Sequence, residues 1–310
     1  MESIVIKNHQ IIENTTSKNI KLNDRKLTIP EKTIYEKPLK ITLLEDNHEE
    51  LEINIGSNSD VKIILEVADK SKGNSDYRIK LITNENTNLK YLLIAALESK
   101  NAILTHEFVA GKDSNLDLLA GLVSDVLTAK IDVKVAGIGA SVKIRAVAVS
   151  SDNNDQKIDV YMNHMAPNTF GDMTNIGIAN KKGRVILNGV EKIEKGMKNS
   201  NVYQTLKGVI TSDDAVVEVN PILLIDEYDI KAGHAATVGR LEEEALYYLQ
   251  SRGLTKKDAE KLIINGFLRP VIDEIEDEEL KERFNELVNL RIWWINESRY
   301  KKKIPVLYKE

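Results

Sequence analysis

The chain has 310 residues, of which 42% are hydrophobic and 29% charged, a composition typical of a globular protein with a substantial core. The net charge of −5 comes from acidic and basic residues mixed along the whole sequence, which argues against a nucleic-acid partner. No apolar run approaches the ~20 residues of a membrane-spanning helix, and no signal peptide is visible, so we expect a cytoplasmic protein without a membrane partner. With no cysteine, the chain offers no disulfide, thiol nucleophile or thiolate ligand, but histidine and carboxylate ligands remain open to it.

Most of the chain before Gly239 consists of short β-type runs separated by turns rich in Gly, Asn, Asp and Ser. Several runs alternate: in residues 129–137, Ile131, Val133 and Val135 share one face, opposite charged side chains. Between residues 102 and 164 the strands begin roughly every 12 to 16 residues with no helix between them, which fits a sandwich, a barrel or a solenoid. The loops are too irregular for tight hairpins, and this favours the solenoid slightly. The runs are 61–68, 89–97, 102–110, 116–123, 129–137, 141–149, 157–164, 184–190, 206–212 and 216–225.

The period becomes helical after Gly239. Leu241 and Leu249 share a face of a first helix, and Gly253 is placed to end it in a left-handed conformation. Thr255 reads as the N-cap of a second helix, with Asp258 in the position of a capping box.

The second helix carries Leu262 and Phe267 on its apolar side, and we expect Pro270 to terminate it. A third helix is predicted over roughly residues 274–297, with Trp294 as a partner anchor. The expected organisation is therefore an N-terminal segment, a β core and a small helical domain that must dock on something to be stable. The corresponding ranges are 1–50, 51–238 and 239–310.

Two of the five histidines, His106 and His164, lie in β context. For His106 and His164 we expect packing inside the β structure rather than ligation. His234 follows Gly233, so a turn there would free its imidazole to act as an iron ligand or a proton shuttle; the alternative is a turn histidine bonded to a neighbouring strand.

Three acidic residues, Asp226, Glu227 and Asp229, lie just upstream of His234. If this stretch is extended, Asp226 and Asp229 project to opposite faces and cannot simply form one site with the histidine. A dimer interface could change this by bringing two copies together.

The junction between the two parts contains a long motif, "IDEYDIKAGHAATVGRLEEEALYYLQSRGLTKKDAEKLIINGF" (225–267), which closely resembles the signature of the SufB/SufD family of iron–sulfur cluster assembly proteins. Upstream, "GRVILNGVEKIEKGMKNSNVYQTLKGVITSDDAVVEVNPIL" (183–223) is similar to the glycine-bounded strands of that family. The resemblance covers at least residues 160–268. Within the family, "HAATVG" looks more SufD-like.

The resemblance implies a right-handed parallel β-helix followed by a helical domain. It also implies pairing of two β-helices, as a homodimer or with a SufB/SufD paralogue, and docking of SufC, an ABC-type ATPase, on the helices. No phosphate-binding glycine loop occurs in this chain, so ATP hydrolysis must belong to the partner. We expect a non-enzymatic scaffold that meets the ATPase through Leu241, Leu249, Leu262, Phe267 and Trp294.

Two departures concern sulfur. SufD-type proteins often have a cysteine two residues before the histidine, where this chain has Ala232, and the stretch in which SufB-type proteins carry a cysteine, Gln204 to Ser212, has none. A transient iron–sulfur cluster would therefore need His234, carboxylates such as Asp226, Glu227 and Asp229, or thiols from exogenous sulfide or partners; His234 is the candidate metal ligand. The missing cysteines also leave open a purely structural SufD-like role beside a cluster-bearing SufB. A β-helix enzyme acting on carbohydrate or acyl groups is a third reading, which the absence of a catalytic motif disfavours.

Overall fold

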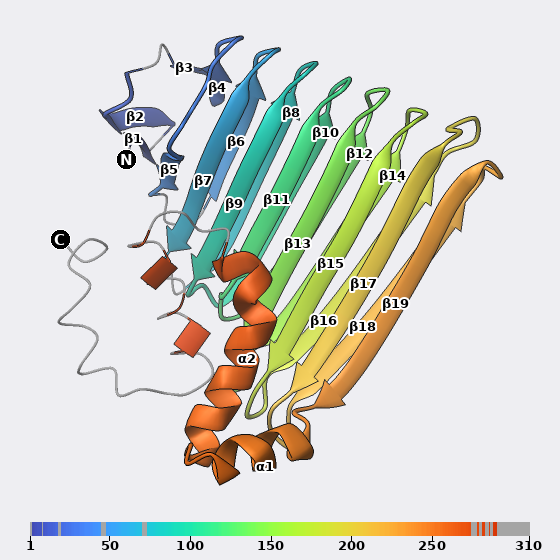
Figure 1. Ribbon diagram of the computed structural model, residues 1–310. Helices are drawn as coiled ribbons and strands as arrows, with labels where there is room; N and C mark the ends of the chain where they lie inside the picture. Colours follow the sequence, from blue (N-terminus) through green and yellow to red (C-terminus); the bar gives the residue numbers. More distant parts are fainter. Residues whose placement is uncertain are drawn as a thin grey trace.

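The computed structural model describes residues 2–7, 9–17, 20–44, 48–69 and 73–273, together with residues 278, 281, 282, 285, 288 and 289. The protein is mainly β, with about 60% strand, and the strands wind into a solenoid of about 7 turns (Figure 1). The strands alternate between two sheets, so each turn contributes one strand to each sheet. The fold class expected from the sequence, a parallel β solenoid followed by helices, is confirmed.

Two long sheets form the walls of the solenoid. Sheet A has 10 strands in the order β19-β17-β15-β13-β11-β9-β7-β5-β1-β2, and sheet B has 9 in the order β18-β16-β14-β12-β10-β8-β6-β4-β3. The strands of sheet A are β1 (Glu2–Lys7), β2 (Gln10–Asn14), β5 (Leu39–Leu43), β7 (Asp60–Asp69), β9 (Asn88–Leu97), β11 (Asn115–Leu122), β13 (Ser141–Ser150), β15 (Phe170–Ala179), β17 (Ser200–Ile210) and β19 (Ile230–Arg240). Those of sheet B are β3 (Lys21–Asn23), β4 (Lys26–Ile29), β6 (His48–Ile55), β8 (Asn74–Thr83), β10 (Asn101–Ala110), β12 (Leu127–Val135), β14 (Asp155–His164), β16 (Arg184–Ile193) and β18 (Val216–Ile225).

The turns between the sheets stack in register, as the strands do. Asn58 and Asn86 both take positive φ, of 58° and 52°, which asparagine tolerates better than most side chains. Their side chains bond to each other, with Asn86 Nδ2 donating to Asn58 Oδ1 at 2.8 Å. Successive turns approach so closely at Gly137 that an added Cβ would lie 2.1 Å from the backbone carbon of Gly111. The polar, glycine-bearing turns therefore hold the register of the coils.

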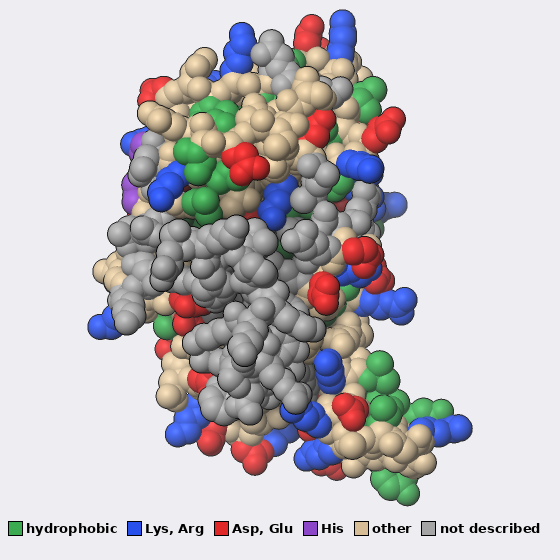
Figure 2. Space-filling view, turned by 90° about the vertical axis from the view of Figure 1, so that its left-hand side faces the viewer, with side chains coloured by type: hydrophobic (Ala, Val, Ile, Leu, Met, Phe, Trp, Pro, Cys, Tyr) green, Lys and Arg blue, Asp and Glu red, His purple; other side chains and the backbone are tan. Residues whose placement is uncertain are grey.

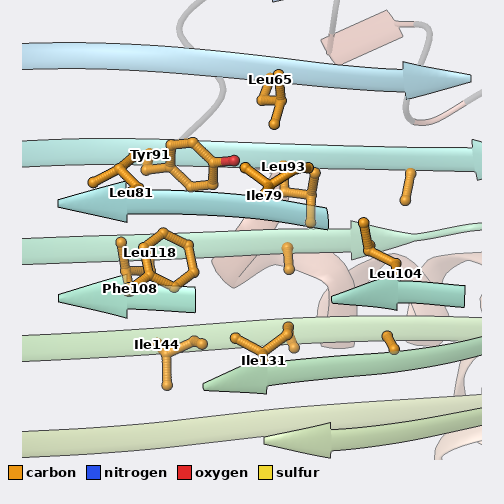
Figure 3. Close-up of a cluster of buried hydrophobic side chains, with 14 of the residues drawn as sticks. Leu65, Ile79, Leu81, Tyr91, Leu93, Leu104, Phe108, Leu118, Ile131 and Ile144 are labelled. Carbon is orange, nitrogen blue, oxygen red and sulfur yellow. The ribbon is translucent and has the colours of Figure 1, made fainter. Parts of the chain in front are cut away.

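The space between the two sheets is filled by the inward side chains of both. Figure 3 shows part of this core, where Tyr91 and Leu118 of sheet A face Phe108 and Ile131 of sheet B. All four are at most 3% exposed. His106 is buried here too, as expected: its Nε2 lies 2.7 Å from the Tyr91 hydroxyl and its ring stacks on Phe108 at 3.9 Å. The middle of the solenoid is thus a mainly apolar core.

A second apolar cluster lies on the outer face of sheet A, where helix α2 (Lys256–Ile272) crosses the strands (Figure 1). Ile264 and Leu268 of this helix are fully buried against side chains such as Ile94 and Val149. The part of sheet A beneath α2 is therefore covered on both faces, which explains why β9 reads as the continuous apolar run "LKYLLIAAL" while sheet B strands alternate.

The two helices begin and end near the predicted positions. Helix α1 (Glu243–Ser251) is followed by Gly253 at φ +94°, and Thr255 caps α2 by accepting from the Asp258 backbone N–H at 3.2 Å, both as expected. Pro270 does not end α2, which continues to Ile272. A proline in a helix removes one backbone N–H donor, and α2 continues for two residues beyond Pro270 despite the missing hydrogen bond.

The predicted third helix lies mostly outside the described residues, and so does Trp294. Val288, one of the few described residues of that segment, is 1% exposed and belongs to the outer cluster on sheet A. Among the residues that the structure describes, no helix is long and apolar enough to cross a bilayer.

The first 50 residues contribute to the same two sheets: β5 pairs in parallel with β7, and β4 with β6. The first four strands also form two hairpins, in which β1 pairs antiparallel with β2 and β3 pairs antiparallel with β4. These two hairpins close the N-terminal end of the solenoid. The domain boundaries suggested at residues 50 and 238 stay predictions.

Candidate functional site

The opposite end of the solenoid is open. Among the described strands, β18 pairs only with β16 and β19 only with β17, so both have one unpaired edge. No further coil covers the inward side chains of β19, and all of its residues are exposed except Ile230 and Gly233, which are half-buried. Unpaired strand edges beside exposed inward side chains form a surface suited to another chain.

His234 lies in the middle of β19, where the sequence suggested a turn at a strand–helix junction. The strand continues for six more residues because the glycines and small side chains of "AGHAATVG" fit a parallel ladder as well as a turn. His234 pairs in register with Gln204, whose side chain points inward, so the imidazole lies on the inward face of β19 at the open end. It is exposed and has no hydrogen-bond partner among the described residues.

The three acidic candidates lie in the loop that joins β18 to β19, before the strand that carries His234. Glu227 organises this loop: its carboxylate accepts from the backbone N–H groups of Gly196 at 2.8 Å, Tyr228 at 2.9 Å and Asp229 at 3.4 Å. These N–H donors, that of Tyr228 first, lower the pKa of Glu227. His234 stands four residues into β19, about 13 Å along the strand. One chain therefore does not bring the acids and the histidine together.

No group of three or more histidine, aspartate or glutamate side chains is placed to hold a metal ion within the described part of the chain. Thiolate ligands are excluded because the sequence has no cysteine. The donors of the open end therefore do not fit an iron–sulfur cluster held by one copy. The ligand roles of His234, Asp226, Glu227 and Asp229 stay predictions.

The residues expected to meet a partner divide into two groups. Leu241 is buried and Phe267 packs on the outer apolar cluster, so both hold the helices to sheet A. Leu262 is 53% exposed, and two residues not singled out from the sequence, Tyr247 and Tyr248, are 76% and 55% exposed. Hydrophobic side chains are visible in Figure 2 on the lobe that projects at the lower right. The exposed apolar surface of the helices is thus built mainly from α1 and the start of α2.

Directly below the open coil, the interior becomes polar. His164, Asn175, Glu191 and Gln204 all point inward from neighbouring strands, and none is more than 2% exposed. His164 Nδ1 lies 2.7 Å from Thr169 Oγ1. Its Nε2, both oxygens of Glu191, both amide atoms of Asn175 and the Gln204 Oε1 have no hydrogen-bond partner in the described residues. Such groups are rare in native interiors.

Burial shifts the pKa of the titratable groups in this cluster. Loss of hydration, and secondarily the charge of Asp172, raises the pKa of Glu191 to about 8. Burial lowers the pKa of His164 to about 4. At neutral pH both side chains are therefore mainly uncharged, which is how an interior tolerates them.

Sequence reasoning expected His164 to be buried, which is confirmed, but it overlooked the cluster. The sequence signal that could have revealed the cluster is a polar residue at an inward position of an alternating strand. Glu191 stands between Gly189 and Ile193, and Gln204 between Val202 and Leu206, where apolar side chains are the rule.

Together these features define a two-sheet parallel β-solenoid with one hairpin-closed end, one open end and a helical tail on its outer face. The chain matches the family model "SUF system FeS cluster assembly, SufBD core domain" over residues 43–267, a longer stretch than the one that carries the sequence signature. The chain belongs to this family.

Curated proteins similar in sequence to this chain support the family assignment. The chain is 32% identical to the iron–sulfur cluster assembly protein SufD of Bacillus subtilis over 216 residues, 69% of this chain and 49% of that protein. It is 27% identical to SufD of Escherichia coli over 158 residues, 51% of this chain and 37% of the relative. A SufBD family protein of Staphylococcus epidermidis is 25% identical over 200 residues, 64% and 43% of the two chains. The chain thus spans about half the length, or less, of the curated relatives it matches.

Proposed function

We propose that this protein is a non-enzymatic scaffold for iron–sulfur cluster assembly that works as a dimer formed through the open end of its solenoid. The observation that carries the proposal is the last coil, whose strands have free edges and whose inward face exposes His234, Ala236 and Val238. A second solenoid, either another copy or a SufB/SufD paralogue, would pair with these edges and cover that face.

The cluster is the cargo of this dimer. With no cysteine in the chain, His234 supplies an imidazole, and the other donors come from the partner, from sulfide or from carboxylates. Dimerisation places His234 at the junction of two solenoids, where a ligand from one copy can meet a ligand from the other. This would supply the donors that one chain lacks.

The helical tail is the proposed docking surface for an ABC-type ATPase. Tyr247, Tyr248 and Leu262 expose apolar and aromatic surface of the kind that anchors protein partners. Because α2 packs across sheet A, movement of a docked ATPase pair would be transmitted directly to the coils beneath it. Closure of the ATPase on ATP would then strain the scaffold dimer and open the site near His234.

Dimerisation is tested by sedimentation of the wild type and of Val238→Asp, which puts a charge on the exposed inward face. The variant should sediment as a monomer, alone or with a co-expressed paralogue. Ile12→Asp is the matched control, since Ile12 is 57% exposed on β2 at the other end and should change nothing. Unchanged association in Val238→Asp contradicts the proposed interface.

The ligand role of His234 is tested by anaerobic reconstitution with iron and sulfide in the presence of the ATPase. His234→Ala should bind and transfer less iron while its association state is retained. If the variant binds and transfers iron unchanged, the assignment of His234 fails.

ATPase docking is tested by co-purification. Leu262→Asp and Tyr247→Asp should lose the ATPase, while Ile34→Asp, which changes an equally exposed residue (62%) near the closed end, should retain it. Retention of the ATPase by both helical variants contradicts the docking surface.

A second role remains supported by one observation, the complete absence of cysteine. In that role the chain would stabilise a separate cluster-bearing SufB without holding the cluster itself. Purification of this chain without any uptake of iron, alongside uptake by its heterodimer, favours the structural role.

A further inference from the structure

The buried polar cluster below the open coil lies in the two coils formed by β14, β15, β16 and β17. The next coil forms its roof: Leu223 stacks in register on Glu191, and His234 on Gln204. Leu223 is only half-buried and His234 is exposed, so one partly open layer separates the cluster from solvent. Toward the N-terminal end, the apolar interior closes the cluster off.

Two glycines make room for the large side chains of this cluster. A Cβ at Gly171 on β15 would lie 2.5 Å from His164 Nε2 and 2.7 Å from Met162 Sδ, so both atoms approach the same point. Met162 pairs in register with Glu191, and both side chains point inward from neighbouring strands. Imidazole, thioether and carboxyl groups therefore gather on one side of the interior.

The second glycine, Gly189 on β16, stands opposite the amide of Gln204. A Cβ there would lie 2.8 Å from Gln204 Nε2 and 3.1 Å from Met173 Sδ. The Gln204 Nε2 and Met173 Sδ atoms are 3.5 Å apart, so the amide nitrogen has a weak partner and the amide oxygen has none. Gln204 thus offers an unpaired amide oxygen on the side of the interior that faces Gly189, two residues before Glu191 on β16.

The free atoms of the cluster are mostly electron-pair donors. The Thr169 hydroxyl lies 2.7 Å from His164 Nδ1, 2.8 Å from the Ser200 hydroxyl and 3.2 Å from the Ala166 carbonyl oxygen. When it donates to that carbonyl, it accepts from His164 Nδ1 and leaves His164 Nε2 as a bare lone pair. The Glu191 oxygens, Gln204 Oε1 and Met162 Sδ are likewise acceptors. A carboxylate buried without a partner is costly, so a cation that binds there must displace the carboxyl proton and then supplies the counter-charge. Imidazole and thioether select iron, zinc or copper over magnesium or calcium.

We propose that His164, Glu191 and Gln204, with the thioether of Met162, form a buried binding site for a divalent transition-metal cation, which enters through the open last coil. Metal sites in proteins are often built from three or more histidine, cysteine, aspartate or glutamate side chains, and no such group occurs among the described residues. The proposed site differs because only His164 and Glu191 are of these types, and an amide and a thioether complete it. It is distinct from His234, and it belongs to a single copy of the chain. It therefore stands whether or not the proposed dimer exists.

The probe is Co2+, added anaerobically to the full chain after removal of metals by a chelator. Equilibrium dialysis gives the stoichiometry and affinity, and the visible ligand-field absorption reports a site with nitrogen and sulfur donors. Glu191→Gln keeps the shape of the side chain and removes the charge, so it should fold, and circular dichroism checks this. It should weaken Co2+ binding by at least about tenfold, and His164→Gln should do the same.

Met162→Leu should shift the absorption bands, because it removes the sulfur while conserving the packing volume. Two matched controls should retain the tight site: His106→Gln, a buried histidine farther from the open end, and His234→Ala, the exposed histidine above the cluster. No tight Co2+ binding by the wild type, or unchanged binding by Glu191→Gln, overturns the proposal. Loss of the site in His234→Ala alone moves it to the open end and overturns the interior assignment.

Discussion

At the N-terminal end of the solenoid, β1 turns back into β2 and β3 into β4, and the inward side chains of β1 and β4 are buried, whereas the inward face of β19 at the other end is exposed. The closed end pairs part of its inward polar groups: Glu49 on β6 is 1% exposed and its Oε1 lies 2.7 Å from His9 Nδ1, while its Oε2 has no hydrogen-bond partner in the described residues. Below the open end, Glu191 is equally buried and has no partner.

The contrast separates an end built for stability from an end built for binding. The last strands at both ends, β2 and β3 or β18 and β19, each have one unpaired edge among the described strands, but only at the N-terminal end are the inward side chains, such as Ile4 and Leu27, fully buried. The open end leaves the inward face of β19 exposed, and polar side chains lie beneath it. The difference implies that stability concentrates at the closed end and function at the open end, and four predictions test this.

The largest effect is expected from Ile4→Ala at the closed end. Ile4 on β1 is 0% exposed, and its truncation should lower the free energy of unfolding by about 2–5 kcal/mol. Leu223→Ala, the matched change at the open end, should lower it by less than about 1.5 kcal/mol, because a half-buried side chain leaves no closed cavity. Urea unfolding followed by circular dichroism compares the two. Equal losses would remove the difference in stability between the ends.

The second prediction concerns acid and the sealed interior. Burial lowers the pKa of His106 to about 3, below the ordinary 6.5. Between these two values the side chain is protonated in the unfolded state and neutral in the folded state. Stability from this residue is complete above pH 6.5 and is lost as the pH falls toward 3. The free energy of unfolding of the wild type relative to His106→Phe should therefore drop by about 3 kcal/mol between pH 7 and pH 4.

Phe108→Leu is the control for the acid experiment, since it loosens the same stack without removing a titratable group. Its difference from the wild type should not depend on pH. A His106→Phe difference that is equally flat between pH 7 and pH 4 would contradict a sealed, neutral His106.

A smaller effect is expected in the docked tail. Thr255→Ala removes the side-chain cap of α2 and should lower the free energy of unfolding by about 1 kcal/mol. Lys257→Ala, on the exposed side of the same first turn, is the control and should change it little. Thermal unfolding of the two variants measures the difference. A loss confined to the tail, without loss of the solenoid, would show that the two parts unfold separately.

The smallest and most local effect is expected from Glu227→Ala in the loop before β19. The variant loses the carboxylate that holds the N–H groups of Gly196 and Tyr228, so the last coil should open more often. Hydrogen exchange should become several-fold faster in β19 and remain unchanged in β9. Asp226→Ala, next to it in the same loop, is the control. Equal protection of β19 in all three proteins would contradict the organising role of Glu227.

Much of this fold was predictable from local patterns. The alternation of Ile131, Val133 and Val135 identified a strand with one buried face, and Thr255 and Gly253 marked helix ends, because periodicity and caps are local properties. The strand β15 was missed: its inward positions include Gly171 and Asn175, so it lacks the apolar alternation of its neighbours. The outcome at His234 was missed for the same reason, since small residues serve a turn and an edge strand equally well.

The sequence by itself determined that this protein is a β-solenoid with a helical tail, that it resembles SufB/SufD proteins, and that thiolates of its own cannot hold a cluster. Only the tertiary structure decided that His234 lies on the exposed inward face of the last coil and that His164, Glu191 and Gln204 are buried together inside the solenoid. The physical reason is the coil: residues about thirty positions apart become neighbours through the stacking of successive turns, and that register depends on every turn between them.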